Sequence, residues 1–173
     1  ILLNFSEELK IPIHIFRLPN VFGKWSKPNY NSVVSTFCYN IVHDIPININ
    51  NSEAILNLVY IDDVIKEFIN IMENLEKKIE TKNFKSITPF YQITVGDLAK
   101  QLYAFKKMRN SNILERVGKG LRRALYSTYV SYFPEQQFSH PIKTYGDSRG
   151  IFIEMLKTPD CGQFSCFTVL PNI

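Results

Sequence analysis

The sequence predicts an α/β fold with a parallel sheet, followed near the C-terminus by an all-β unit. Three observations support this prediction. Residues 13–23, IHIFRLPNVFG, are typical of a short buried strand that ends in a tight turn. Amphipathic helical patterns stand on both sides of this stretch, which is the alternation of a parallel α/β sheet. Between residues 151 and 169, two apolar runs are joined by a turn and show no helical pattern, which indicates paired strands.

The composition is that of a folded protein with reduced cysteines. The 173 residues are 45% hydrophobic and 13% aromatic, which is enough to bury a core and excludes general disorder. A net charge of +4 is too small to indicate a nucleic-acid partner. No apolar run has the length of a membrane span, and no stretch has the pattern of a signal peptide. Cys161 and Cys166 match no common zinc or redox spacing, so we expect a cytoplasmic protein with free thiols.

The first elements along the chain lead to the first candidate binding residues. Helical spacing predicts a helix over residues 1–10, followed by a strand over 13–18. Pro19, Asn20 and Val21 would then stand at the carboxyl end of that strand. Open parallel sheets bind ligands outside the carboxyl ends of their strands, so we expect these three residues to lie at a ligand site.

A polar loop, residues 24–31, separates this turn from the next predicted helix, which Ser32 can cap. Tyr30 and Asn31 offer a hydroxyl group, an amide and an aromatic surface, which suit a sugar or a uracil ring. An ordinary solvated loop has the same composition, and from chemistry alone both interpretations stay open.

Two short strands are predicted at residues 46–49 and 56–61, separated by polar turn residues. Asp62 or Asp63 then caps a helix. Adjacent carboxylates at a helix start satisfy free N–H groups and point apart, so we favour this structural role over acid/base catalysis.

A further strand is predicted at residues 91–94, and Thr94 and Asp97 form a capping pair for the helix after it. Basic residues are spread over 106–123. They could contact nucleic acid or an anionic membrane surface, but an exposed connecting helix has the same composition, and we favour that interpretation.

Residues 17–23, RLPNVFG, resemble the R-x-P-N-V-x-G segment of extended short-chain dehydrogenases/reductases, enzymes that oxidise, reduce, epimerise or dehydrate nucleotide sugars. Residues 28–34, P-x-Y-N-S-V-V, are similar to the substrate-side loop and helix of one branch of that family, and residues 60–64 resemble its Y-I-x-x-D segment. Leu58 departs from the pattern, because many relatives have a phosphate-binding arginine there. The residue that replaces this arginine is not identified by the sequence.

The resemblance implies specific binding residues. Those implied for the nicotinamide cofactor, NADPH or NADH, are Pro19, Asn20 and Val21. Those implied for a UDP-sugar substrate are Asn20, Tyr30, Asn31 and Ser32. The glycines never fall as G-x-x-G-x-x-G, and we expect both that glycine-rich turn and the catalytic Tyr-x-x-x-Lys pair to lie outside the chain. We therefore expect an internal fragment that is inactive alone.

Residues 125–132 and 147–165 resemble the junction in bifunctional capsular polysaccharide enzymes, where a short-chain reductase domain leads into a cupin. The implied fold is the C-terminal part of a Rossmann-type extended short-chain dehydrogenase/reductase domain, followed by the first strands of an all-β cupin. The implied domains are a partial nucleotide-sugar reductase at 1–138 and the start of a cupin at 139–173.

The implied function is reduction of a 4-keto nucleotide sugar, a UDP-2-acetamido-2,6-dideoxy-hexulose, with NADPH in UDP-N-acetyl-L-fucosamine synthesis. The cupin would epimerise the sugar beside its carbonyl group, zinc would be bound outside this chain, and the full-length protein would be a homodimer. Two alternatives stay open: an NAD-dependent epimerase or 4,6-dehydratase, and a non-catalytic binding module that uses the basic helix.

Overall fold

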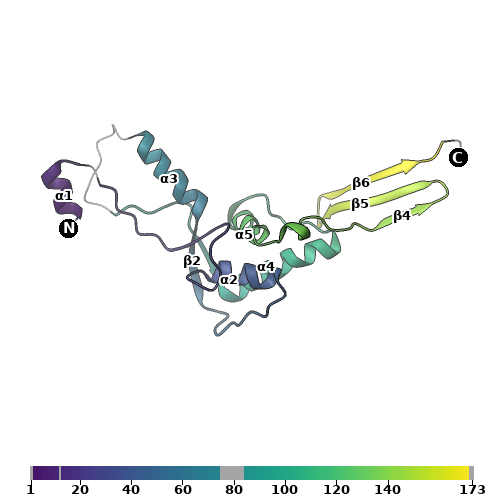
Figure 1. Cartoon of the computed structure of the whole chain (residues 1–173), viewed down its shortest axis with the longest axis horizontal. Coiled ribbons are helices and arrows are strands. Elements are labelled where there is room, and N and C mark those ends of the chain that lie inside the picture. The colour runs from purple at the N-terminus through teal and green to yellow at the C-terminus, as the bar shows by residue number, and fades with distance from the viewer. Residues whose placement is uncertain (1, 12, 75–83, 172–173) are drawn as a thin grey trace.

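The computed structural model describes residues 2–11, 13–74 and 84–171. The chain is elongated, with α1 and α3 at one end, helices α2, α4 and α5 in the middle, and strands β4, β5 and β6 projecting from the other end (Figure 1). In chain order the elements are α1 (Leu2–Leu9), β1 (Asn20–Phe22), α2 (Val33–Val42), β2 (Ile55–Tyr60), α3 (Ile61–Glu73), β3 (Tyr91–Thr94), α4 (Val95–Ser111), α5 (Gly120–Val130), the 3₁₀ helix η1 (Glu135–Gln137), β4 (Thr144–Asp147), β5 (Gly150–Thr158) and β6 (Gly162–Val169). No helix in these described ranges combines the length and the apolar character that a membrane crossing requires.

The first sheet has the order β1-β2-β3. Strands β1 and β2 are parallel, and their last residues, Phe22 and Tyr60, are register partners. Strand β3 runs antiparallel to β2, with Tyr91 opposite Leu58. The predicted α/β class is therefore confirmed, and the carboxyl ends of the two parallel strands lie side by side.

Helices α2, α4 and α5 pack around one apolar core. Leu98 and Leu102 of α4 are fully buried, as are Val34 of α2 and Leu125 of α5. Removing each such side chain from water stabilises the fold by roughly 1.5–3 kcal/mol. The predicted capping residues begin two of these helices: the Oγ atom of Ser32 accepts a hydrogen bond from Ser35 N at 3.3 Å, and Oγ1 of Thr94 accepts one from Asp97 N at 3.1 Å.

Two predicted strands are wrong. Residues 13–18 are extended, but pair only through an isolated bridge between Phe16 and Lys85, with Arg17 N bonded to Lys85 O at 3.1 Å. Residues 46–49 form a mostly exposed loop. An apolar run becomes a strand only where a neighbouring strand can satisfy its backbone, and neither run has such a neighbour among the described residues.

The start of α3 also differs from the prediction. The helix begins at Ile61 with Tyr60 at the N-cap position and no side-chain capping hydrogen bond, so neither Asp62 nor Asp63 is the cap. Both carboxylates lie in the first turn, where the positive end of the helix dipole favours negative charge.

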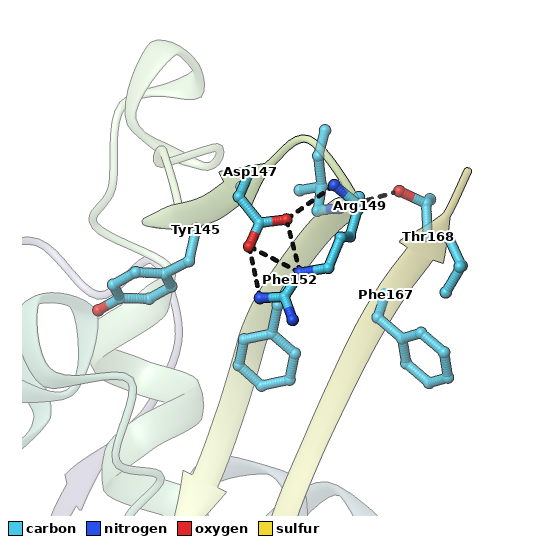
Figure 2. Close-up of a pocket in the computed structure, with 10 residues that line it drawn as sticks. Tyr145, Asp147, Arg149, Phe152, Phe167 and Thr168 are labelled. Atoms are coloured by element: carbon cyan, nitrogen blue, oxygen red, sulfur yellow. Dashed lines mark hydrogen bonds and ion pairs between the residues drawn. The ribbon is translucent and has the colours of Figure 1, made fainter. Parts of the chain in front are cut away.

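The second sheet has the order β4-β5-β6 and is antiparallel throughout. The predicted strands at β5 and β6 are confirmed, and β4 is an additional strand. Beside the β4–β5 turn is a hollow of about 460 Å³. Figure 2 shows its polar wall, where Arg149 forms an ion pair with Asp147 at 2.6 Å, and its apolar wall, which includes Phe152 and Phe167.

Residues 112–116, which follow α4, connect the helical part of the chain to strand β5 of the second sheet. We call them the connecting segment. Leu114 N donates to Lys157 O at 2.7 Å, and Lys157 N donates to Asn112 O at 2.8 Å. The side-chain amide of Asn112 donates to Glu154 O at 3.2 Å, and Arg116 pairs with Asp160. Strand β4 pairs with residues 150–153 of β5, so the connecting segment takes up the part of that edge that β4 leaves free.

Candidate functional site

The carboxyl ends of β1 and β2 bring two short stretches of chain together. Phe22 and Tyr60 are register partners, so the residues that follow them, Gly23 to Trp25 and Ile61 to Asp63, leave the sheet side by side. Ligands of open α/β sheets bind outside such strand ends. We call Lys24, Trp25, Tyr60 and Asp62 the strand-end site.

Gly23 allows this close approach. The residue is buried, and a Cβ atom added to it would lie 2.2 Å from Cγ2 of Ile61. No real side chain tolerates that distance, so any residue larger than glycine would push the two strand ends apart.

Lys24 is the central cation of the site. Its Nζ atom lies 3.0 Å from Oδ2 of Asp62 and 5.8 Å from the centre of the Tyr60 ring. The hydrogen bond to Asp62 raises the pKa of Lys24 against a smaller opposing effect of burial, so the ammonium group is charged at neutral pH. Burial, followed by the Asp62 charge, raises the pKa of Tyr60, so its phenol keeps its proton. The site therefore offers a cation and a hydroxyl donor, which suit a phosphate or a sugar oxygen.

Trp25 provides the aromatic surface of the site. Its side chain is 79% exposed, and the Nζ atom of Lys24 lies 5.9 Å from the centre of its ring. Its backbone N–H donates to the Oγ atom of Ser131 at 3.2 Å, which ties the loop to the end of α5. An exposed indole beside an ammonium group can stack on a flat ring.

The structure does not place Pro19, Asn20 and Val21 where the sequence predicts them. Asn20 opens β1 instead of following a strand, and it is exposed at the end opposite Phe22. Val21 lies within the strand and packs against the cluster of Val59, Val64 and Ile87. The predicted placement is wrong because the strand begins at Asn20 rather than at residue 13, so the same three residues stand at its other end. Ligand binding by these residues stays a prediction.

Tyr30, Asn31 and Ser32 lie on the loop between β1 and α2. Tyr30 is 73% exposed, with the Nζ atom of Lys27 5.8 Å from its ring centre, and Asn31 is exposed. The hydroxyl oxygen of Ser32 already accepts the hydrogen bond that caps α2. Tyr30 and Asn31 are therefore accessible to a ligand, whereas Ser32 has a structural role at this helix start.

The residues that the sequence did not single out are Lys24, Trp25 and Tyr60. Lys24 and Trp25 directly follow the turn glycine, and Tyr60 ends the neighbouring strand, so each occupies a strand end of the kind that binds ligands. The signal becomes visible only when β1 is known to end at Phe22 and to pair with β2.

Comparison with known proteins assigns this part of the chain. Residues 1–85 match the model of the NAD dependent epimerase/dehydratase family. The whole chain is a homologue of the UDP-2-acetamido-2,6-beta-L-arabino-hexul-4-ose reductase of Pseudomonas aeruginosa, with 55% identity over 168 residues. The match covers 97% of this chain and 44% of that reductase.

Solved structures support the same assignment. The capsular polysaccharide assembling protein CapF of Staphylococcus aureus matches with a TM-score of 0.92 and 38% identity, over 99% of this chain and 46% of that one. UDP-glucose 4-epimerase of Thermotoga maritima matches with a TM-score of 0.58 at 19% identity, over 76% of this chain and 49% of that one, which shows the fold alone. The chain thus spans less than half the length of these relatives. Its N-terminal part, which matches the epimerase/dehydratase model, has the Rossmann-like α/β fold that the sequence predicts.

The epimerase family implies a nicotinamide cofactor, and the described residues do not by themselves fit its pyrophosphate. Gly23 faces Ile61 and provides no open backbone cradle. A Tyr-x-x-x-Lys spacing does occur at Tyr103 and Lys107, but both side chains are exposed on α4, opposite the face that Leu102 and Phe105 bury. Tyr103 and Lys107 therefore have the spacing of the family's catalytic pair, but they do not lie beside a sheet as that pair does.

No metal site is formed by the residues that the structure describes, since no three histidine, cysteine or carboxylate side chains cluster there. His14, His43 and His140 come from three separate segments, and His43 Nδ1 lies 2.9 Å from the Tyr39 carbonyl oxygen. The side chains of residues 2–11, 13–74 and 84–171 thus form no zinc site.

Proposed function

We propose that this chain is the substrate-side part of a reductase that acts on the 4-keto group of a UDP-2-acetamido-2,6-dideoxy-hexulose. The observation that carries this proposal is the 55% identity, over 168 residues, to a curated UDP-2-acetamido-2,6-beta-L-arabino-hexul-4-ose reductase. The similarity to CapF favours the same place in capsular polysaccharide synthesis, with UDP-N-acetyl-L-fucosamine as the product.

The strand-end site supplies the phosphate contact that the proposal needs. Leu58, which stands where many relatives have arginine, is 1% exposed in the centre of β2 and faces the core. Lys24 lies at the carboxyl end of the neighbouring strand and is charged, so we assign the diphosphate contact to Lys24. Trp25 and Tyr30 would offer exposed rings to the uracil, and Asn20 and Asn31 would bind sugar oxygens.

NADPH, when bound, supplies the hydride that reduces the ketone. Pro19, Asn20 and Val21 are assigned to the cofactor side, and the role of this chain's residues is to bind and orient the sugar. Ser32 would contribute to the substrate loop by fixing the start of α2.

The division into a reductase domain at 1–138 and the start of a cupin at 139–173 is part of the same proposal. Three antiparallel strands begin at Thr144, and the similarity to CapF extends over 99% of the chain. Zinc binding by residues outside this chain, a cytoplasmic location and a homodimer of the full-length protein belong to the proposal as well.

The test is Asn20→Ala in the complete reading frame that encodes the chain. The variant and its parent are mixed with NADPH and the 4-keto UDP-sugar, and nicotinamide absorbance is followed. We expect kcat/KM to fall about tenfold, the loss of one hydrogen bond to a bound ligand. The thermal midpoint should be unchanged, because the Asn20 side chain is exposed.

Asn110→Ala is the matched control, since Asn110 is an exposed asparagine on α4. It should leave both kcat/KM and the midpoint unchanged. A parent that converts the sugar without consuming NADPH would point to the epimerase or dehydratase alternative. A parent with no turnover on any 4-keto UDP-sugar would overturn the reductase proposal.

A further inference from the structure

The two residues that directly follow α5, Ser131 and Tyr132, contact the loop after β1 from 106 residues away in the sequence. The Trp25 backbone N–H donates to the Oγ atom of Ser131 at 3.2 Å, and the Tyr132 hydroxyl donates to the carbonyl oxygen of Ser26. Two successive loop residues are therefore bound by two successive residues of one helix end.

Ser131 and Tyr132 are each held in place by contacts with the helical part of the chain. The Ser131 hydroxyl donates to the Thr128 carbonyl oxygen at 2.7 Å, which turns its lone pairs toward the loop, and Thr128 is fully buried. The Tyr132 ring packs edge-on against Tyr39, with 6.1 Å between ring centres. Burial raises the pKa of Tyr132, so its phenol keeps the proton that it donates.

The conformation of the loop at Trp25 and Ser26 depends on the hydrogen bonds with Ser131 and Tyr132. Trp25 has a φ of 59°, in the left-handed region that costs a non-glycine residue free energy. Its exposed ring cannot hold this conformation by packing. The hydrogen bonds from α5 are the contacts that favour it.

We propose that Ser131 and Tyr132 are positioning residues: they hold the backbone of Trp25 and Ser26 so that Lys24 and Trp25 face a ligand at the strand-end site. The effect on catalysis rests on the proposed function. The effect on the loop does not, and it can be measured separately.

Trp25 is the single tryptophan of the chain, so its fluorescence reports on the loop directly. In the 173-residue chain, Ser131→Ala should lower the anisotropy of Trp25 and increase its quenching by acrylamide, with the loop opening shifted about fivefold for one lost hydrogen bond. Tyr132→Phe keeps the ring and its packing against Tyr39, removes only the hydroxyl, and should act in the same direction. Ser131→Thr keeps a γ oxygen and should restore the parent signal.

Ser127→Ala, one turn earlier on α5 at a half-buried position, is the matched control and should change neither signal. Circular dichroism checks that each variant is folded. Unchanged Trp25 signals in both folded variants, Ser131→Ala and Tyr132→Phe, would overturn the positioning role.

In the complete reading frame, the same two variants should raise KM for the UDP-sugar several-fold and change kcat much less, because ligand orientation at the loop is affected first. Altered fluorescence together with a parent that reduces no 4-keto sugar would support the positioning role and overturn the proposed function. Altered fluorescence with an unchanged KM would overturn the assignment of Lys24 and Trp25 to the substrate.

Discussion

A single hydrogen atom at Gly23 sets the distance between the two strand ends of the site. A methyl group at this position would lie 2.2 Å from Cγ2 of Ile61 and 3.0 Å from its Cβ. We expect Gly23→Ala to lower the free energy of unfolding by about 1–3 kcal/mol, the usual cost of overpacking a filled position. Urea unfolding of the chain, followed by circular dichroism, measures this loss.

Gly118→Ala provides the control for this prediction. A Cβ atom at Gly118 would meet nothing within 4 Å, and the residue is exposed. The substitution should change stability by less than about 0.5 kcal/mol, or raise it slightly through the unfolded chain. Equal losses at both glycines would mean that Ile61 moves aside and that the strand ends are not tightly fixed.

The three cysteines should differ sharply in reactivity. Cys38 is fully buried, and burial raises the pKa of its thiol, whereas Cys161 and Cys166 are exposed. The thiolate is the reactive form, so an aromatic disulfide reagent at neutral pH should titrate two thiols in the folded chain. The third should react only after denaturation. A Cys38→Ser variant that loses one of the two fast-reacting thiols and keeps the slow one would contradict this assignment.

Helix α4 begins at a cap whose contribution can be isolated. Thr94→Ala removes the oxygen that accepts the Asp97 N–H at 3.1 Å and should cost about 1 kcal/mol, measured by urea unfolding. Thr94→Ser keeps that oxygen and should lie close to the parent. If serine and alanine cost the same, the methyl group of Thr94 and not the cap would be the stabilising feature.

At the scale of elements, the sequence predicts what depends on near neighbours. The caps at Ser32 and Thr94 are correct, because each joins residues three positions apart. Strands depend on partners far along the chain, and 13–18 finds only Lys85. The sequence does not predict the short strand β4, since its four residues contain no apolar run.

In helix α3, the sequence pattern predicts more burial than the structure shows. Its apolar spacing predicts a buried face, but among its described residues only Val64 is buried. Ile65, Phe68 and Ile69 are each more than 40% exposed. A periodic pattern records that a face is apolar, and the structure decides whether anything covers it.

The whole molecule is held together at the connecting segment, and Asn112 is its critical residue. Asn112 has a φ of 53°, its carbonyl oxygen accepts from Lys157 N, and its side chain donates to Glu154 O. Asn112→Ala loses the side-chain bond and strains the backbone, so we expect a loss of about 1.5–3 kcal/mol. Asn112→Gly keeps the backbone relaxed and should lose only about 1 kcal/mol.

Thermal unfolding and amide hydrogen exchange of the two variants test this prediction. Exchange at Leu114 and Lys157 should accelerate more in the alanine variant, because both amides donate across the same junction. Equal stability of the alanine and glycine variants would show that the left-handed backbone of Asn112 carries no cost.

The residues of the candidate site come together only through contacts between distant parts of the chain. The rule that ligands bind at strand carboxyl ends predicted the right kind of place, but the residues that occupy it come from segments 38 positions apart, as the Lys24–Asp62 pair shows. The register of β1 on β2 brings them together, and no local pattern encodes that register.

The hydrogen bonds of the connecting segment also determine how this protein can be divided. A cut at residue 138 follows the proposed domain boundary, but it leaves the partner of Glu154 and Lys157 on the other piece. The excised β unit would carry an open strand edge at the position where Leu114 now lies, and open edges recruit strands from other copies. Separate expression of 139–173 therefore invites aggregation, whereas a piece that begins before Asn112 keeps that edge occupied by its native partner.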